Sequence, residues 1–194
     1  MSEPCQDVLL DSNAYFRLGI SIHPLLHQPF GTSPVYSLHV LAELDDEYAT
    51  SVRLRHKFTW VSQLEYRNDR KTKRYELRGN DRTDAINAFS FLLAYADEEK
   101  INLSREDLKA LAVGFVKRIP VVTDDQGMTK VADANSIECW TTVKLLRLMV
   151  TAGRTDMEKV VEIFEYWEYE KDLPMPLNKL RQLYKEYFGE DCPI

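Results

Sequence analysis

Three short apolar runs, each followed by polar residues, stand out along the chain. They occupy residues 8–10, 34–38 and 120–123. A short continuous apolar run is typical of a strand that is buried on both faces of a parallel sheet. The first and third runs lead directly into acidic residues. The sequence therefore predicts at least three buried strands, two of which end in carboxylates.

Helical spacing of apolar residues occurs between these runs. After residue 104 the apolar positions recur at intervals of three or four: Leu108, Leu111, Ala112, Phe115 and Ile119. The pattern predicts helices over about residues 40–55, 84–100 and 104–119. It also predicts a short helix that Ser12 or Asn13 caps and Gly19 ends. This alternation of strands and helices is typical of an α/β fold with a mostly parallel sheet.

Two parts of the chain depart from this alternation. Residues 57–80 place aromatic positions on both sides of a polar segment, and a hairpin and a broken pair of helices fit that pattern equally well. Beyond about residue 137 the pattern is wholly helical. We therefore predict an α/β domain over residues 1–136 and a helical C-terminal extension, packed on it, over residues 137–194.

Composition narrows the class of protein. The chain has 194 residues, of which 44% are apolar and 11% aromatic, a content that disfavours disorder. No apolar run reaches the roughly 18 residues of a membrane span, and the N-terminus lacks a basic, apolar leader. The three cysteines are far apart and form no C-x-x-C pair, which argues against disulfides and zinc. We expect a cytoplasmic protein with no membrane partner.

The net charge of −6 is unevenly distributed. Residues 155–191 hold ten acids and five bases, whereas residues 67–82 hold seven bases and three acids, a local balance of +4. A solvated loop explains the basic segment, but its interleaved tyrosines fit contact with RNA about as well. The candidate RNA-binding residues are Arg67, Arg70, Lys71, Lys73, Arg74 and Arg78.

The strands that end in acids suggest a site. Ligands of open α/β sheets bind outside the carboxyl ends of the strands. If residues 8–10 and 120–123 form neighbouring strands, Asp11 and Asp125 face each other, and such a pair needs a proton or a cation between them. Oxygen ligands with no His or Cys cluster nearby favour Mg²⁺ or Mn²⁺. An ion of this kind suits phosphoryl chemistry, where it activates water.

Four segments together resemble a known family, the PIN-domain nucleases. Asp-Ser-Asn at 11–13 resembles their opening motif, and Leu-Ala-Glu-Leu at 41–44 is similar to their second-acid motif. The segment 107–112, an Asp followed by Ala and apolar residues, looks like their third-acid helix. Residues 121–128 resemble their T-x-D-x-x-F motif, with Met128 at the aromatic position. The four motifs occur in the family's order, and the resemblance weakens past about residue 135.

The resemblance implies a three-layer α/β/α sandwich that cleaves RNA with one or two Mg²⁺ or Mn²⁺ ions. Many members are VapC-like toxins of toxin–antitoxin pairs, which implies a homodimer and a cognate protein antitoxin. Carried over by position, the metal ligands and catalytic residues are Asp11, Glu43, Asp107 and Asp125. The residues expected to support them are Asn13, Thr123 and Asp124. The Thr-x-Asp register selects Asp125 over Asp124 as the fourth acid.

Each acid also has a structural interpretation. Asp11 fits a helix cap, and Glu43 fits a solvated helix face among other acids. Ser104-x-x-Asp107 fits a capping box, a role that is compatible with metal binding. The sequence thus supports two hypotheses of different classes. The first is a metal-dependent endoribonuclease, and a DNA nuclease that uses the same chemistry is a version of this hypothesis with a different substrate. The alternative is a catalytically weak or inactive PIN-fold module that binds RNA or protein.

Overall fold

The computed structural model describes residues 5–194 and contains a four-stranded, all-parallel sheet in the order β2-β1-β3-β4. The strands are β1 (Gln6–Leu10), β2 (Tyr36–Val40), β3 (Val121–Val122) and β4 (Cys139–Trp140). The three predicted strands are confirmed, although β2 begins and ends two residues later than expected. Leu10 pairs with Val40 on one side and with Val122 on the other, so β1 is an inner strand.

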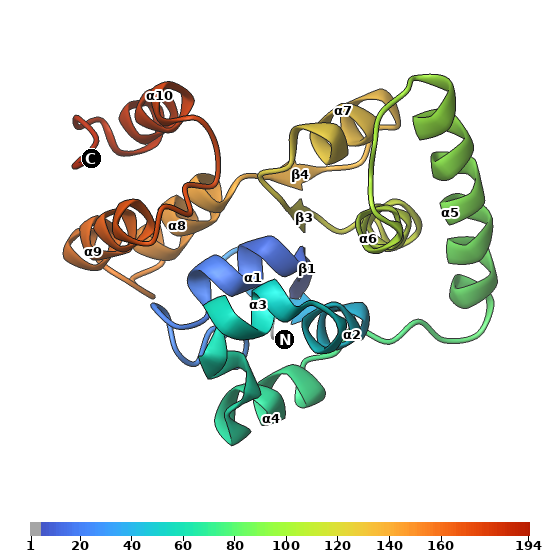
Figure 1. Cartoon of the computed structure of the whole chain (residues 1–194), viewed down its shortest axis with the longest axis horizontal. Coiled ribbons are helices and arrows are strands. Elements are labelled where there is room, and N and C mark those ends of the chain that lie inside the picture. The colour runs from blue at the N-terminus through green and yellow to red at the C-terminus, as the bar shows by residue number, and fades with distance from the viewer. Residues whose placement is uncertain (1–4) are drawn as a thin grey trace.

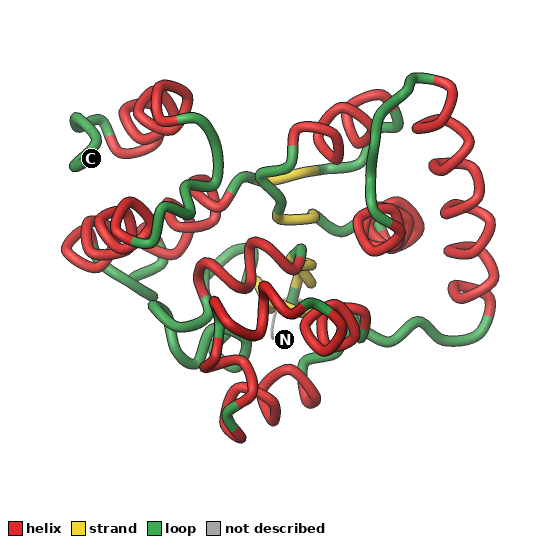
Figure 2. The backbone as a smooth tube through the Cα atoms, in the orientation of Figure 1, coloured by secondary structure: helices red, strands yellow, loops and turns green. Residues whose placement is uncertain are grey.

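Helices lie on both faces of the sheet (Figures 1 and 2). Successive side chains of a strand point to opposite faces, and Val8 and Leu10 accordingly pack in one apolar cluster while Leu9 packs in another. The face of Leu9 is covered by α5 (Asn80–Glu98), α6 (Arg105–Lys117) and α7 (Gln126–Ala134). The other face is covered by α1 (Ser12–Leu18), α8 (Thr142–Thr151) and α9 (Met157–Tyr169), and α10 (Leu177–Phe188) packs on α8. The predicted α/β class with a parallel sheet is confirmed.

The predicted helix over residues 40–55 is interrupted. Val40 ends β2, α2 spans Glu43–Thr50, and α3 spans Val52–Lys57. Ser51 separates the two helices because its backbone is extended and its hydroxyl accepts a hydrogen bond from the N–H of Leu54 at 3.3 Å. Such a cap favours a new helix start over continuation of the old one.

The structure also decides between the two interpretations of residues 57–80. A short 3₁₀ helix, η1 (Thr59–Ser62), leads into α4 (Leu64–Thr72), so this segment forms broken helices and not a hairpin. The chain then runs beside β2, where the N–H of Val40 donates to the carbonyl of Lys73 and the N–H of Tyr75 donates to the carbonyl of Val40. Residues 73–75 therefore cover the outer edge of the sheet.

The expectation of a wholly helical segment beyond residue 137 is wrong. Cys139 and Trp140 form β4, which pairs with β3 in parallel. A strand of two residues is too short to show a periodicity of two, which explains why the pattern missed it. The sheet therefore includes residues on both sides of the predicted boundary at 136. Within residues 5–194, no helix combines the length and the apolar character needed to cross a membrane.

Candidate functional site

Asp11 and Asp125 come to the same edge of the sheet because β1 and β3 are parallel neighbours. The N–H of Asp11 donates to the carbonyl of Val122 at 3.0 Å, and Asp11 is only 5% exposed. Thr123 links the two acids: its hydroxyl donates to Oδ2 of Asp11 at 3.2 Å and accepts from the N–H of Asp125 at 3.1 Å. The predicted supporting role of Thr123 matches this geometry.

Burial gives Asp11 an unusual proton affinity. Removal from water and, second, the negative charge of Asp107 raise the pKa of Asp11 to about 7, against the opposing hydrogen bond from Thr123. Burial disfavours the charged form of a carboxyl group, and a nearby like charge adds to that penalty. Asp11 is therefore poised to hold a proton or a cation near neutral pH.

Asp107, at the start of α6, has the capping role that the sequence suggested for it. Its Oδ2 accepts from the N–H of Ser104 at 2.9 Å, and its own N–H donates to the Ser104 hydroxyl at 3.0 Å, which confirms the capping box. Burial raises the pKa of Asp107 despite these hydrogen bonds, and the charge of Asp125 raises it further. Asp107 therefore interacts electrostatically with Asp11 and Asp125, the acids at the two strand ends, while it also caps α6.

Asp125 is the exposed member of the group. It is the N-cap of α7, and its Oδ1 accepts from the N–H of Met128 at 2.8 Å. This cap holds the side chain in a defined position at the end of β3 and uses only one of its two carboxylate oxygens.

The acid of α2 that approaches this group is Glu47, whereas the sequence motif points to Glu43. The charge of Glu47 acts on Asp11, and the pKa of Glu47 is itself raised by burial and, against a hydrogen bond with Ser12, by the charge of Asp107. Glu43 instead pairs with the ammonium of Lys109 at 3.0 Å. Glu43 and Glu47 are one helical turn apart, a spacing that puts both on one face of α2. This spacing is the feature of the sequence that could have indicated Glu47 as a candidate.

Asp124 serves the fold directly. Its side chain is 1% exposed and accepts hydrogen bonds from the N–H and the hydroxyl of Thr142, at 3.0 and 2.8 Å, while Arg17 lies 3.7 Å away. Burial raises its pKa, and the Thr142 hydrogen bonds oppose that shift. Asp124 thus ties the end of β3 to the start of α8.

A cavity of about 580 Å³ opens beside these strand ends. Its acidic wall includes Asp11, Asp124 and Asp125, and exposed Asn13 lines it as well. Other lining residues bring positive charge, namely Arg17, Lys100 and Lys130, and residues 174–176 between α9 and α10 form a further wall. The cavity therefore combines carboxylates with cations, a composition that suits a phosphate group held near a metal ion.

The carboxylates have the donor chemistry that Mg²⁺ or Mn²⁺ requires. Asp11, Asp107 and Asp125 supply hard oxygen atoms, and each of them also accepts a hydrogen bond from the protein. No three Asp, Glu, His or Cys side chains of residues 5–194 converge into a closed ligand cluster. Mg²⁺ usually keeps several waters and is held by one or two carboxylates, so these residues fit an open, hydrated site.

The six predicted RNA-binding residues have different surroundings in the structure. Arg67, Lys71 and Arg74 are exposed and line a groove of about 570 Å³ on α4. Lys73 donates to the Ser37 hydroxyl, and Arg78 is exposed in the loop before α5.

Arg70 differs from its neighbours because it is only 3% exposed. Its guanidinium donates to Asp45 at 2.8 Å, to the Tyr15 hydroxyl at 3.3 Å, and to the carbonyls of Tyr66 and Val61 at 3.1 and 3.0 Å. A guanidinium used in this way is not available to an RNA phosphate, so we assign Arg70 to the fold.

We expect Arg70→Ala to lower the free energy of unfolding by about 2 to 3 kcal/mol, because it leaves buried acceptors without a donor. Arg67→Ala, one turn away and exposed, is the matched control and should change stability by less than about 0.5 kcal/mol. Urea denaturation followed by circular dichroism measures both. Equal stability of the two variants would contradict a structural role for Arg70.

The chain matches no family model, no curated protein and no solved structure with which it was compared.

Proposed function

We propose that the protein is a metal-dependent endoribonuclease with a PIN-like arrangement of its sheet. One observation carries the proposal: the parallel neighbours β1 and β3 deliver Asp11 and Asp125 to one cavity, and the pKa of buried Asp11 is raised to about 7. A buried carboxyl group of this kind beside further acids is costly for the fold, and perturbed acids of this kind cluster at functional sites. The four acids of the proposed site are Asp11, Glu47, Asp107 and Asp125, with Glu47 in place of Glu43.

Each residue of the proposed site has its own role, which follows from its position. Asp11 and Asp125 would hold Mg²⁺ or Mn²⁺ from adjacent strand ends, Asp107 would add negative charge from α6, and Thr123 orients Asp11. When bound, a divalent ion supplies an activated water and stabilises the leaving oxygen of a phosphodiester. Lys100 and Lys130, which line the same cavity, would neutralise the phosphate that the acids otherwise repel.

Metal removal tests this proposal on the unmodified protein. A 3′-labelled single-stranded RNA should be cut in the presence of Mg²⁺ or Mn²⁺, with a 5′-phosphate on the labelled downstream fragment, and should stay intact in excess EDTA. Restoring Mn²⁺ should restore cleavage. Cutting that persists in EDTA would rule out the metal mechanism, and a matched DNA strand decides between RNA and DNA as the substrate.

The groove on α4 supports the second candidate, an RNA-binding module with little or no catalysis. Arg67, Lys71 and Arg74 line it without any of the four proposed acids, so RNA could be held there even if no cleavage occurred. Binding of RNA in EDTA that Arg67→Ala weakens, with no cleavage at any Mn²⁺ concentration, would favour this candidate. The role as a toxin, the homodimer, the antitoxin and the cytoplasmic location stay predictions from the resemblance and the composition.

A further inference from the structure

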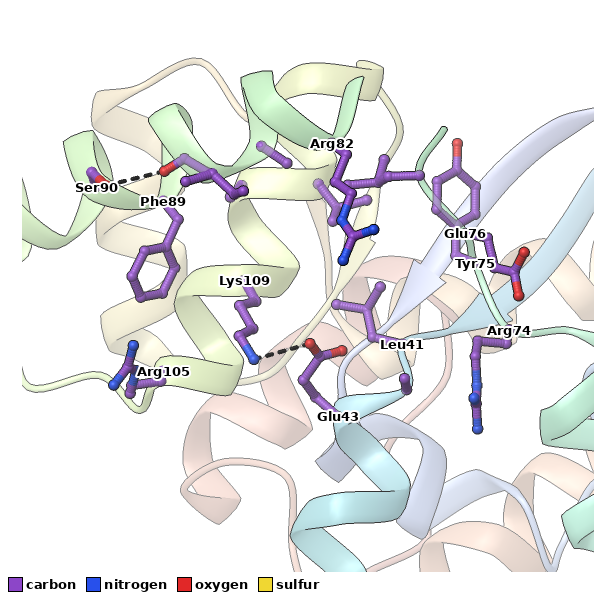
Figure 3. Close-up of a pocket in the computed structure, with 16 residues that line it drawn as sticks. Leu41, Glu43, Arg74, Tyr75, Glu76, Arg82, Phe89, Ser90, Arg105 and Lys109 are labelled. Atoms are coloured by element: carbon purple, nitrogen blue, oxygen red, sulfur yellow. Dashed lines mark hydrogen bonds and ion pairs between the residues drawn. The ribbon is translucent and has the colours of Figure 1, made fainter. Parts of the chain in front are cut away.

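Another cavity lies away from Asp11 and Asp125, between α5, α6, the start of α2 and the edge residues 74–77. It encloses about 800 Å³ (Figure 3). Its apolar lining comes from all four segments and includes Leu41, Leu77, Phe89 and Val113. We call this feature the α5–α6 groove. None of the four acids of the proposed nuclease site lines this groove, although Glu43, the acid that the sequence motif selected, does.

The apolar surface of the groove continues onto the outside of α5. Ile86, which lines the groove, is 60% exposed, and Leu93 is 37% exposed. Together with Phe89 they occupy positions i, i+3 and i+7, so they share one face of the helix. Exposed apolar surface that joins a concave, partly charged rim is typical of a site where another protein docks.

Positive charge surrounds this apolar surface. Arg82 and Arg105 form no ion pair within the described residues, and Figure 3 shows the Arg82 guanidinium reaching from α5 over the groove. The Arg105 guanidinium lies over the Phe89 ring, 5.8 Å from its centroid. Lys109 and Arg74 also line the groove but are paired with Glu43 and Asp45, at 3.0 and 3.1 Å. Of the lining acids, only Glu76 has no ion-pair partner in the described chain.

The charge and the shape of the groove indicate which kind of molecule can bind there. Single-stranded RNA needs open aromatic faces for its bases, but the lining is mainly aliphatic and Arg105 covers the Phe89 ring. A second copy would have to present the same surface in a two-fold contact, which would bring four unpaired guanidinium groups into one interface with only the two copies of Glu76 to balance them. A partner with apolar residues flanked by carboxylates satisfies both the apolar lining and the two guanidinium groups.

We infer that the α5–α6 groove binds a short, acidic, amphipathic helix of another protein. Apolar side chains of that helix at i, i+3 or i+4, and i+7 would fill the groove over Ile86 and Phe89, as in other helix-in-groove contacts. Glu or Asp on its flanks would pair with Arg82 and Arg105, and a guanidinium binds a carboxylate with two parallel hydrogen bonds. Binding at this site does not depend on the proposed nuclease activity.

Selection of peptides on the full chain tests the inference. The probe is a displayed library of random 16-residue peptides, and the best binders are then synthesised and measured by fluorescence anisotropy. We expect enriched peptides with apolar residues at helical spacing and Asp or Glu beside them. Ile86→Asp and Arg82→Glu should each weaken their binding at least tenfold. Replacing the acids of the peptide by Lys should weaken binding to the wild type and recover part of the loss in Arg82→Glu.

Matched controls use equivalent residues outside the groove. Phe115→Asp changes another exposed apolar residue, on α6, and Arg147→Glu reverses an exposed charge on α8. Both should bind the selected peptides as the wild type does. Ile86 and Arg82 are on the outer surface of α5, and an unchanged melting temperature of each variant confirms that the fold is intact.

Four results would overturn the inference. These are no enrichment, enrichment of basic or non-helical peptides, binding that is insensitive to Ile86→Asp, and binding lost equally in Phe115→Asp. Light scattering that shows a dimer abolished by Ile86→Asp would assign the groove to a second copy. Binding of a 15-nucleotide oligouridylate that Arg82→Glu abolishes, with no peptide binding, would assign it to RNA.

Discussion

Replacing Asp125 by Asn is expected to reduce RNA cleavage at least about 100-fold while the protein stays folded. Asn is as good an N-cap as Asp, so the hydrogen bond from the Met128 N–H to residue 125 is preserved and α7 still begins there. The substitution removes only the negative charge. Loss of metal-assisted charge stabilisation costs several kcal/mol of the activation barrier, and each 1.36 kcal/mol is a tenfold change in rate. Initial rates of cleavage of a labelled RNA measure the effect.

Asp133→Asn is the matched control for this experiment. Asp133 is an exposed acid near the other end of the same helix, α7, and it does not line the cavity. It should retain wild-type cleavage, whereas Asp11→Asn should lose activity as Asp125→Asn does. Wild-type rates in Asp125→Asn, or an equal loss in Asp133→Asn, would remove the strand-end carboxylates from the mechanism.

The second large effect concerns stability, because Asp11→Asn should stabilise the metal-free protein above neutral pH. With its pKa raised to about 7 in the folded state, against an ordinary value of 3.8, Asp11 binds a proton more tightly when folded than when unfolded. Its contribution to stability is therefore full below about pH 4 and is lost as the pH rises toward 7. At 1.36 kcal/mol per pH unit the loss amounts to roughly 4 kcal/mol.

Urea denaturation in EDTA at pH 4.5 and pH 8 tests this effect. The stability advantage of Asp11→Asn over the wild type should be small at pH 4.5 and approach a few kcal/mol at pH 8. Comparison with Asp133→Asn removes the effects of other titrating groups. Mn²⁺ should raise the melting temperature of the wild type at pH 8 but not that of Asp11→Asn. An advantage independent of pH would contradict the raised pKa.

These two results would together describe a trade between stability and activity. A carboxyl group that destabilises the metal-free fold is useful only if something binds to it. Loss of cleavage with a gain of stability in Asp11→Asn would identify Asp11 as a functional residue, because a purely structural residue would lose stability when replaced.

The elements that local patterns determine were predictable. The period of 3.6 residues identified α5 and α6, and the Ser104–Asp107 spacing identified the capping box, because both depend on residues close together in the chain. The short apolar run before Asp11 and the one before Asp125 were enough to predict β1 and β3. The predicted site required these two strands to be neighbours, and in the structure they pair directly.

Other features depend on contacts between distant segments. β4 has two residues and exists only because β3 pairs with it. In the sequence, Arg70 looks like part of a basic surface segment. In the structure, α4 directs it inward to Asp45 and Tyr15, which lie 25 and 55 residues away along the chain. The sequence near Arg70 gives no sign of these two contacts. Glu43 and Glu47 share a helix face, and only the way α2 packs decides which one approaches Asp11 and which pairs with Lys109.

Local patterns along the chain were enough to predict the α/β class, most of the helices and strands, and the presence of acids at two strand ends, because hydrophobic period and capping are local properties. Contacts between distant segments determine which acids share an environment, which cations are free to bind a ligand, and where the α5–α6 groove lies. Burial and charge coupling are properties of neighbours in space, and the chain brings those neighbours from more than 100 residues apart, as for Asp11 and Thr123.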